Sequence, residues 1–276
     1  SVLEAPGFAD AAEYAASETC VFIPNEVSPK ILSSVFSGKY NSWSRFAPKL
    51  SDWTVLDAGK SDGMISFYGR MTTDGDLSDF ITLFERSGAA SSKLSSVLPS
   101  NTLSAASVPF RNVAEYISEY QMFLDARQSL QTRRSTIDVL EKKVGVSPVA
   151  FFTRIETKEA ATASFLVDGK LERVNLIRAA KPDTLKNYTA GQHPYKYSSF
   201  ASAVFGNLFE LPDESSFTYV DGWIISGSPK AVDMFATGKA AKYTLKEYMV
   251  NAGLEDLFSA GQASFMAYLS LTEDRG

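Results

Sequence analysis

The segment TASFLVDGKLERVNLI, Thr162 to Ile177, decides the fold that the sequence predicts. Two strand-like runs, Thr162–Val167 and Leu171–Ile177, flank the dipeptide Asp168-Gly169. An Asp-Gly pair between two such runs is a strong signal for a tight β-hairpin, because both turn residues take a backbone conformation that Asp and Gly tolerate. We therefore expect two adjacent antiparallel strands here.

A second hairpin is predicted nearer the C-terminus, in FTYVDGWIISG. There Asp221-Gly222 joins the runs Phe217–Val220 and Trp223–Ile225 in the same way. Helical patterns lie between these hairpins and the other strands. Hairpins interrupted by helices are typical of the α+β class, so we predict an α+β fold with a largely antiparallel sheet and helices packed on it.

The other elements follow from the spacing of apolar residues. Residues 113–144 carry a helical pattern with a break near Gln128, and Trp53 and Trp223 lie in predicted strands and are expected in the core. A further helix is predicted at Leu77–Arg86, and further strands at Cys20–Ile23, Trp53–Leu56, Met64–Tyr68, Thr102–Val108 and Val149–Ile155.

Two distant stretches read almost alike: SPKILSSVFSGK, Ser28 to Lys39, and SPKAVDMFATGK, Ser228 to Lys239. In each, Ser can cap the first turn of a helix, Pro fits the first helical position, and Gly can end the helix in the left-handed conformation. Each stretch therefore predicts a short capped helix, and strand-like runs flank both.

This similarity leaves two interpretations of the domain organisation open. The chain is one globular unit, residues 1–276, in which two helices share the same capping residues. Alternatively it holds two related strand-helix-strand pseudo-repeats, about 19–110 and 149–271, joined by the helical segment 111–144.

The composition is that of an acidic globular chain. The net charge is -5, the pI is about 5.1 and no basic patch stands out, so no nucleic-acid partner is expected. No run of about 18 apolar residues occurs. The chain begins without methionine, so we expect that a secretion signal or anchor has been removed, and that any membrane contact is made through such an anchor. The one cysteine, Cys20, is predicted to be a small buried side chain.

Motifs for cofactors and metals are weak. DAGKSDG, Asp57 to Gly63, resembles the end of a phosphate-binding P-loop, but it joins two predicted strands and we predict a hairpin turn. Asp74, Asp76 and Asp79 lack the spacing of a calcium loop and fit a turn followed by a helix start. We predict no cofactor, no metal site and no catalytic residue.

Three residues are the ones that we expect to face a ligand. Trp43 lies in the polar stretch YNSWSRF, and His193 and Tyr195 lie in GQHPY. A Ser-His-Asp or Cys-His enzyme would have to use His193, the one histidine. Its place beside Pro194 in a polar segment fits a solvated surface residue better.

The sequence also resembles the envelope-anchored bacterial proteins, common in Bacteroidetes, that carry a domain of unknown function. The resemblance spans about residues 50 to 235 and comprises a Trp before a hairpin, a Leu-Pro-x-x-Thr element, and Tyr-x-x-Gly-Trp before a strand. In this chain these positions are Trp53, Leu98, Pro99, Thr102, Tyr219, Gly222 and Trp223. The resemblance implies export and an N-terminal anchor, and it supplies no catalytic residues.

Taken together, these features favour a non-catalytic extracytoplasmic protein, in the periplasm or at the cell surface, that binds another protein or an envelope component or scaffolds the envelope. One alternative is a carrier of an apolar or glycan ligand in an aromatic-lined groove. A second is a hydrolase, which would need two carboxylates roughly 5–10 Å apart in a cleft.

Overall fold

The computed structural model describes residues 4–15, 19–27, 30, 50–61, 64–73, 75–181, 195–211, 216–253 and 262–270. The chain forms two compact units, which are considered one at a time: Ser1–Arg86 with Met122–Arg127, and Ser87–Gln121 with Gln128–Gly276. None of the helices in these ranges combines the length and the hydropathy needed to cross a bilayer.

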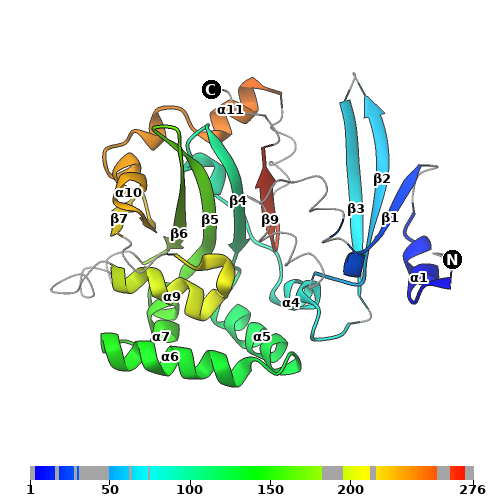
Figure 1. Cartoon of the computed structure of the whole chain (residues 1–276), viewed down its shortest axis with the longest axis horizontal. Coiled ribbons are helices and arrows are strands. Elements are labelled where there is room, and N and C mark those ends of the chain that lie inside the picture. The colour runs from blue at the N-terminus through cyan, green and yellow to red at the C-terminus, as the bar shows by residue number, and fades with distance from the viewer. Residues whose placement is uncertain are drawn as a thin grey trace. The chain divides into compact units, whose positions relative to one another are not determined.

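Figure 1 labels the elements along the chain. The strands are β1 (Cys20–Pro24), β2 (Trp53–Ser61), β3 (Met64–Thr72), β4 (Thr102–Pro109), β5 (Thr157–Val167), β6 (Lys170–Ala179), β7 (Ser216–Val220), β8 (Trp223–Gly227) and β9 (Met266–Leu269). The α-helices are α1 (Phe8–Ala12), α4 (Phe80–Ser87), α5 (Val113–Ala126), α6 (Leu130–Val144), α7 (Pro148–Arg154), α9 (Tyr195–Phe205), α10 (Pro229–Ala236) and α11 (Leu245–Asn251). Short 3-10 helices are η2 (Asn25–Val27), η5 (Leu94–Ser96), η7 (Asn207–Phe209) and η8 (Ala240–Lys242).

The strands form two antiparallel sheets, one in each unit. The first sheet has the order β1-β2-β3 and the second the order β7-β8-β6-β5-β4-β9. Every strand pair in both sheets is antiparallel. The predicted α+β class with largely antiparallel sheets is therefore confirmed.

The predicted central hairpin is β5–β6, and it lies in the middle of the larger sheet. Val167 pairs with Lys170, and the two turn residues between them, Asp168 and Gly169, have φ angles of 50° and 72°. Positive φ at both central residues is what a two-residue turn of type I′ requires. The predicted turn at Asp221 and Gly222, with φ of 48° and 84°, joins β7 and β8 in the same way.

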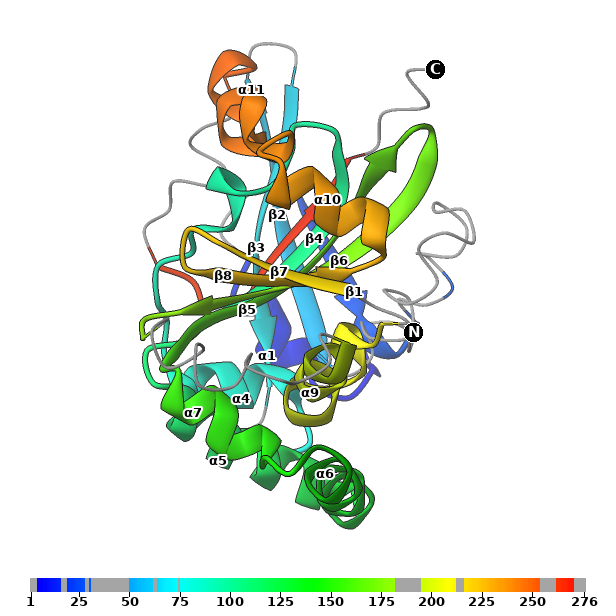
Figure 2. The ribbon, with the colours of Figure 1, turned by 90° about the vertical axis from the view of Figure 1, so that its left-hand side faces the viewer.

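One side of the larger sheet packs against η5, α10, η8 and α11. Figure 2 shows α10 and α9 on opposite sides of β7 and β8. Alternate residues of the strands meet these helices, as expected for side chains that alternate between the two faces of a sheet. The fully buried members of this core include Leu98, Phe165, Leu176, Ile225 and Leu245.

Helices α7 and α9 and the segment η7 pack on the other side of this sheet. The ring of Phe205 at the end of α9 contacts the rings of Phe110, Phe152 and Phe209, with centroids 5.3, 4.8 and 5.9 Å away. Polar side chains of β6 add to this packing, because Arg173 donates to Leu208 O and Asn175 donates to Phe209 O at 2.6 Å. The backbone carbonyls of the irregular segment η7 thus accept hydrogen bonds from side chains of the sheet.

In the first unit, α1 packs on the small sheet. The Trp53 indole donates to Pro6 O at 2.9 Å, and the Phe8 ring lies 5.2 Å from that of Phe22. Trp53 is buried, as predicted, and so is Trp223 in the second unit. Cys20 is half-buried rather than fully buried, and its thiol donates to Asp57 Oδ1 at 3.0 Å.

The strand predicted at Val149–Ile155 is wrong, because these residues form helix α7. Ser147 has an extended conformation (φ -65°, ψ 124°) and Pro148 takes the first helical position. This is the helix start that Ser-Pro favours, and it prevails over the β propensity of the two phenylalanines that follow.

The second of the two similar stretches is the predicted capped helix. Ser228 Oγ accepts from Ala231 N at 3.2 Å, Pro229 opens α10, and Gly238 has a φ of 71°. Of the first stretch, Ser28–Lys39, all but one residue lie outside the described part of the chain. The internal duplication therefore stays a prediction.

Replacing Gly169 with Val should lower the free energy of unfolding by about 1–2 kcal/mol, because a β-branched residue is strained at positive φ. No neighbouring atom lies within 4 Å of a Cβ added at Gly169, so the loss would report backbone strain rather than a clash. Urea unfolding would measure it, with Lys170→Val in β6 as control. Equal stability of both variants would contradict the turn geometry.

A second prediction concerns two stacked tyrosines of α5, Tyr116 and Tyr120, whose rings lie 6.0 Å apart. Burial raises the pKa of Tyr116 well above its usual value, and its hydroxyl has no hydrogen-bond partner. Burial also raises the pKa of Tyr120, but this hydroxyl is bonded to Arg133. Tyr116→Phe should therefore raise the free energy of unfolding at pH 7 by about 1 kcal/mol, whereas Tyr120→Phe should lower it by about the same amount.

The pH dependence follows from the direction of the Tyr116 shift. Because its pKa is higher in the folded than in the unfolded state, the stability linked to the neutral phenol is complete below about pH 10 and falls as the pH rises further. Urea unfolding at pH 7 and above pH 10 should show a smaller alkaline loss for Tyr116→Phe than for the parent protein. An unchanged alkaline loss would count against the burial of this hydroxyl.

Candidate functional site

The side chains of the three residues that were expected to face a ligand lie outside the described part of the structure. Trp43 and His193 lie outside the described residues. Tyr195 is the first residue of α9, but its side chain is not among those described. Their role as ligand-facing residues stays a prediction.

One string in the chain matches the Gly-x-Ser-x-Gly pattern of a hydrolase nucleophile elbow: GKSDG, Gly59 to Gly63. A nucleophile elbow places its Ser between a strand and a helix. Here Ser61 ends β2 and pairs with Met64 at the start of β3. The string therefore connects two strands of a hairpin, as predicted for DAGKSDG, and lacks the setting of an elbow.

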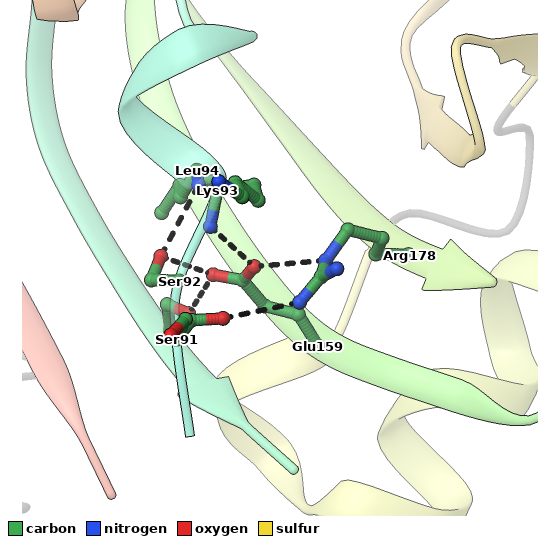
Figure 3. Close-up of polar contacts among 7 residues, drawn as sticks. Ser91, Ser92, Lys93, Leu94, Glu159 and Arg178 are labelled. Carbon is green, nitrogen blue, oxygen red and sulfur yellow. Dashed lines mark hydrogen bonds and ion pairs between the residues drawn. The ribbon is translucent and has the colours of Figure 1, made fainter. Parts of the chain in front are cut away.

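Among the described residues, no group of three or more His, Cys, Asp or Glu side chains is placed to hold a metal ion. The acidic side chain that best resembles a functional carboxylate is Glu159 on β5, which is 0% exposed. Figure 3 shows it between β6 and the segment that leads into η5. We call Glu159 and the residues bonded around it, Ser91, Ser92, Lys93, Ser107 and Arg178, the Glu159 cluster.

Both oxygens of the Glu159 carboxylate are surrounded by donors. Oε1 accepts from the hydroxyls of Ser92 and Ser107, each at 2.5 Å. Oε2 accepts from the backbone N–H of Lys93 at 2.9 Å and from Arg178 Nε at 3.3 Å. A carboxylate offers about four lone-pair sites. These four donors therefore occupy its acceptor capacity.

The sheet register places the charged pair together. Glu159 pairs across the sheet with Arg178 on β6, next to a register shift in β5. The Arg178 guanidinium also donates to Ser91 O at 3.1 Å and lies 6.0 Å from the ring centre of Trp223. With 25% of its side chain exposed, Arg178 links the buried carboxylate to the surface.

This arrangement suits a structural clamp better than a catalytic acid or base. A general base must reach a proton of the substrate within hydrogen-bond distance. Glu159 is closed off from solvent, and each of its acceptor sites already holds an internal donor. Our sequence analysis missed this residue, although a glutamate followed by Ala160 and Ala161 in a strand-like run was a signal that an acidic group would be buried and paired.

An apolar recess lies beside the cluster in the same unit. Its cavity volume is about 10 Å³, which is about the space that one water molecule needs. It is lined by Leu94, Ser95, Leu98, Ala105, Leu245, Met266, Ala267 and Tyr268. Sites for drug-sized ligands usually measure about 300–1,000 Å³, so this recess is too small for a lipid, an oligosaccharide or a large apolar side chain.

The walls of the apolar recess come from four elements. β4 and β9 supply Ala105, Met266 and Ala267, α11 supplies Leu245, and η5 supplies Leu94. Burial raises the pKa of the Tyr268 hydroxyl, so this side chain stays neutral at physiological pH. Ala267 is exposed. It pairs with Ala106, whereas its neighbour Tyr268 pairs with Ala105 of the core, so the Ala267 side chain lies on the other face of the sheet.

Replacing Glu159 with Gln should lower the free energy of unfolding by about 3 kcal/mol. The amide has one acceptor oxygen and brings two donors of its own, so buried donors are left without a partner. Chemical denaturation would measure the loss. Glu156→Gln is a matched control because the Glu156 side chain is partly exposed and pairs with Lys181. If both variants kept the stability of the parent protein, the Glu159 cluster would not be the clamp described.

Comparison with known proteins identifies no relative of this chain. No protein-family model matches the chain, no curated protein matches it, and no solved structure matches its fold. The expected membership of an envelope-anchored family therefore stays a prediction, and a function has to be argued from the residues themselves.

Proposed function

We propose that this is a non-catalytic extracytoplasmic protein that binds another protein or an envelope component. The main observation in support of this proposal is that the acceptor sites of the Glu159 carboxylate are all occupied by internal hydrogen-bond donors. The buried carboxylate best placed for acid-base chemistry is bonded to four internal donors and 0% exposed. Extracytoplasmic location is supported by the resemblance to envelope-anchored proteins.

A carrier of a larger apolar or glycan ligand is less well supported, because the cavity volume of about 10 Å³ falls far below the usual range for such sites.

The proposal predicts site-specific contact in the cells that produce the protein. A photoreactive benzoylphenylalanine at Ala267, an exposed position on the edge strand β9, should give a discrete cross-linked partner, which mass spectrometry would identify. The same residue at Val139 on α6, which is 64% exposed, is the control and should give none.

Binding of the purified partner would then be measured by calorimetry. Ala267→Trp places a large side chain at this exposed position, and it should weaken binding about tenfold or more, which corresponds to ~1.4 kcal/mol. Equal cross-linking at both positions, or unchanged affinity of Ala267→Trp, would contradict the proposal.

A further inference from the structure

We propose that the outer edge of β9 is a site for strand addition, at which an extended segment of a partner protein pairs with Met266–Leu269 and lengthens the larger sheet. This inference rests on the binding role proposed above and names the mode of contact. The occupant is a segment of another protein, and a second copy of this chain is the competing occupant.

β9 is the last strand of the larger sheet (Figure 1), and β4 is its one partner among the described strands. Just beyond this ladder, Ser270 N donates to Leu103 O at 2.8 Å. Bonded and non-bonded residue pairs alternate along an antiparallel ladder. Tyr268 therefore bonds to β4 as Ser270 does, whereas the backbone N–H and C=O of Ala267 and Leu269 point away from β4.

The sequence of β9 lacks the residues that usually block pairing at an edge. Natural edge strands often carry a lysine, a proline or a bulge that prevents another strand from adding. The stretch GQASFMAYLSL, Gly261 to Leu271, contains no charged residue and no proline, and the β4–β9 register has no shift. In the smaller sheet, by contrast, the edge strands β1 and β3 carry Pro24 and Arg70. The outer edge of β9 is therefore suited to pairing.

An extended segment of the chain itself already pairs with the stretch that leads into β9. Ala90 N donates to Ala263 O at 3.0 Å, and Ala263 N donates to Ala90 O at 2.9 Å. This is an isolated antiparallel bridge, and within the described residues no segment continues the pairing along β9. Strand addition would thus involve the four residues of β9 and not the stretch before them.

The side chains beside this edge indicate which kind of segment fits it. Tyr268 and Tyr248 are half-buried and pack against the core of this unit. The Ala267 side chain lies on the other face of the sheet and is exposed. Side chains on neighbouring strands contact each other when they share a face. The added segment should therefore place an apolar or aromatic residue beside Tyr268 and polar residues on either side of it.

The size of the edge favours a segment of a partner over a second copy of the chain. β9 has four residues, and only its two outward residues offer backbone groups to an added strand. A stable interface between two folded proteins usually involves about 20–30 residues on each side. Pairing along β9 is too small a contact to hold two copies together, whereas a short extended peptide can be recognised at a sheet edge by such pairing and a few side-chain contacts.

The test uses a phage-displayed library of random short peptides, panned against the whole chain, and calorimetry with the tightest binder after synthesis. Ala267→Pro should weaken binding of this peptide about tenfold or more, because proline removes an outward N–H. Ala267→Ser keeps this N–H and a small side chain, so it should change the affinity less than about twofold. Proline is tolerated on an edge strand where its N–H would face solvent.

Amide hydrogen exchange of the parent protein gives a second measurement that does not depend on the folding of a variant. The bound peptide should slow exchange of the Ala267 and Leu269 amides about tenfold or more, because each N–H gains a backbone partner. Exchange at Val174 and Leu176 in the centre of β6 should stay unchanged.

The proposal fails if no peptide is selected, or if the selected peptide binds Ala267→Pro as tightly as the parent protein. Unchanged exchange at Ala267 and Leu269 in the presence of the peptide would also overturn it. It fails as well if the protein alone dimerises with rising concentration and protects these two amides, because a second copy would then occupy the edge.

The binding role and strand addition fail separately. If benzoylphenylalanine at Ala267 cross-links a partner that binds Ala267→Pro with unchanged affinity, the binding role stands and strand addition is wrong. If peptides pair with β9 but no partner is cross-linked in cells, the edge is a strand-addition site and the binding role is wrong.

Discussion

A carboxylate that is taken out of water must be surrounded by hydrogen-bond donors, and this requirement organises the second unit around Glu159. The donors come from β4, from β6 and from the segment before η5. None of these contributors is close to Glu159 in sequence. Their convergence means that the observed path of the irregular segment 91–94 depends on the pairing of β4, β5 and β6 in their register.

On the opposite side of the sheet, polar side chains of the central hairpin are likewise hydrogen-bonded to an irregular segment. Arg173 and Asn175 extend from β6 to the backbone carbonyls of η7, and Arg173 Nε also donates to Thr162 on β5 at 3.1 Å. Burial lowers the pKa of Arg173, although an arginine remains charged under any physiological condition. On both faces, long polar side chains of the central hairpin hold irregular segments whose carbonyl and amide groups would otherwise be left without partners.

How much of this structure the sequence predicts depends on how far apart in the sequence the interacting residues lie. The turns at Asp168 and Asp221, the capped helix at Ser228 and the break near Gln128, whose φ is 55°, are decided by a few neighbouring residues. They were predictable for that reason. The helix at Pro148 was missed because apolar and aromatic residues suggested a strand, although Ser147-Pro148 carried the same start signal as Ser228-Pro229.

The Glu159 cluster and the recess could not be predicted in this way. Their residues come together only through the order of the sheet, in which β9 pairs with β4 on the far side of the central hairpin. Pairing between strands so distant in sequence is set by the complete core, and no short stretch encodes it. A buried glutamate can be suspected from its apolar neighbours, but its donors cannot be named.

The use of a charged pair at this position is informative about the segment 91–94. A buried ion pair often adds little net stability compared with apolar residues of similar size, because desolvation offsets the Coulomb attraction. What such a pair does provide is a defined geometry, since each donor must lie at hydrogen-bond distance from a fixed oxygen. Apolar packing in its place would tolerate a shift of the 91–94 segment, whereas the bonds to Glu159 and Arg178 fix its position. The chemistry of the cluster is therefore better explained by the defined path of this segment than by a contribution to stability alone.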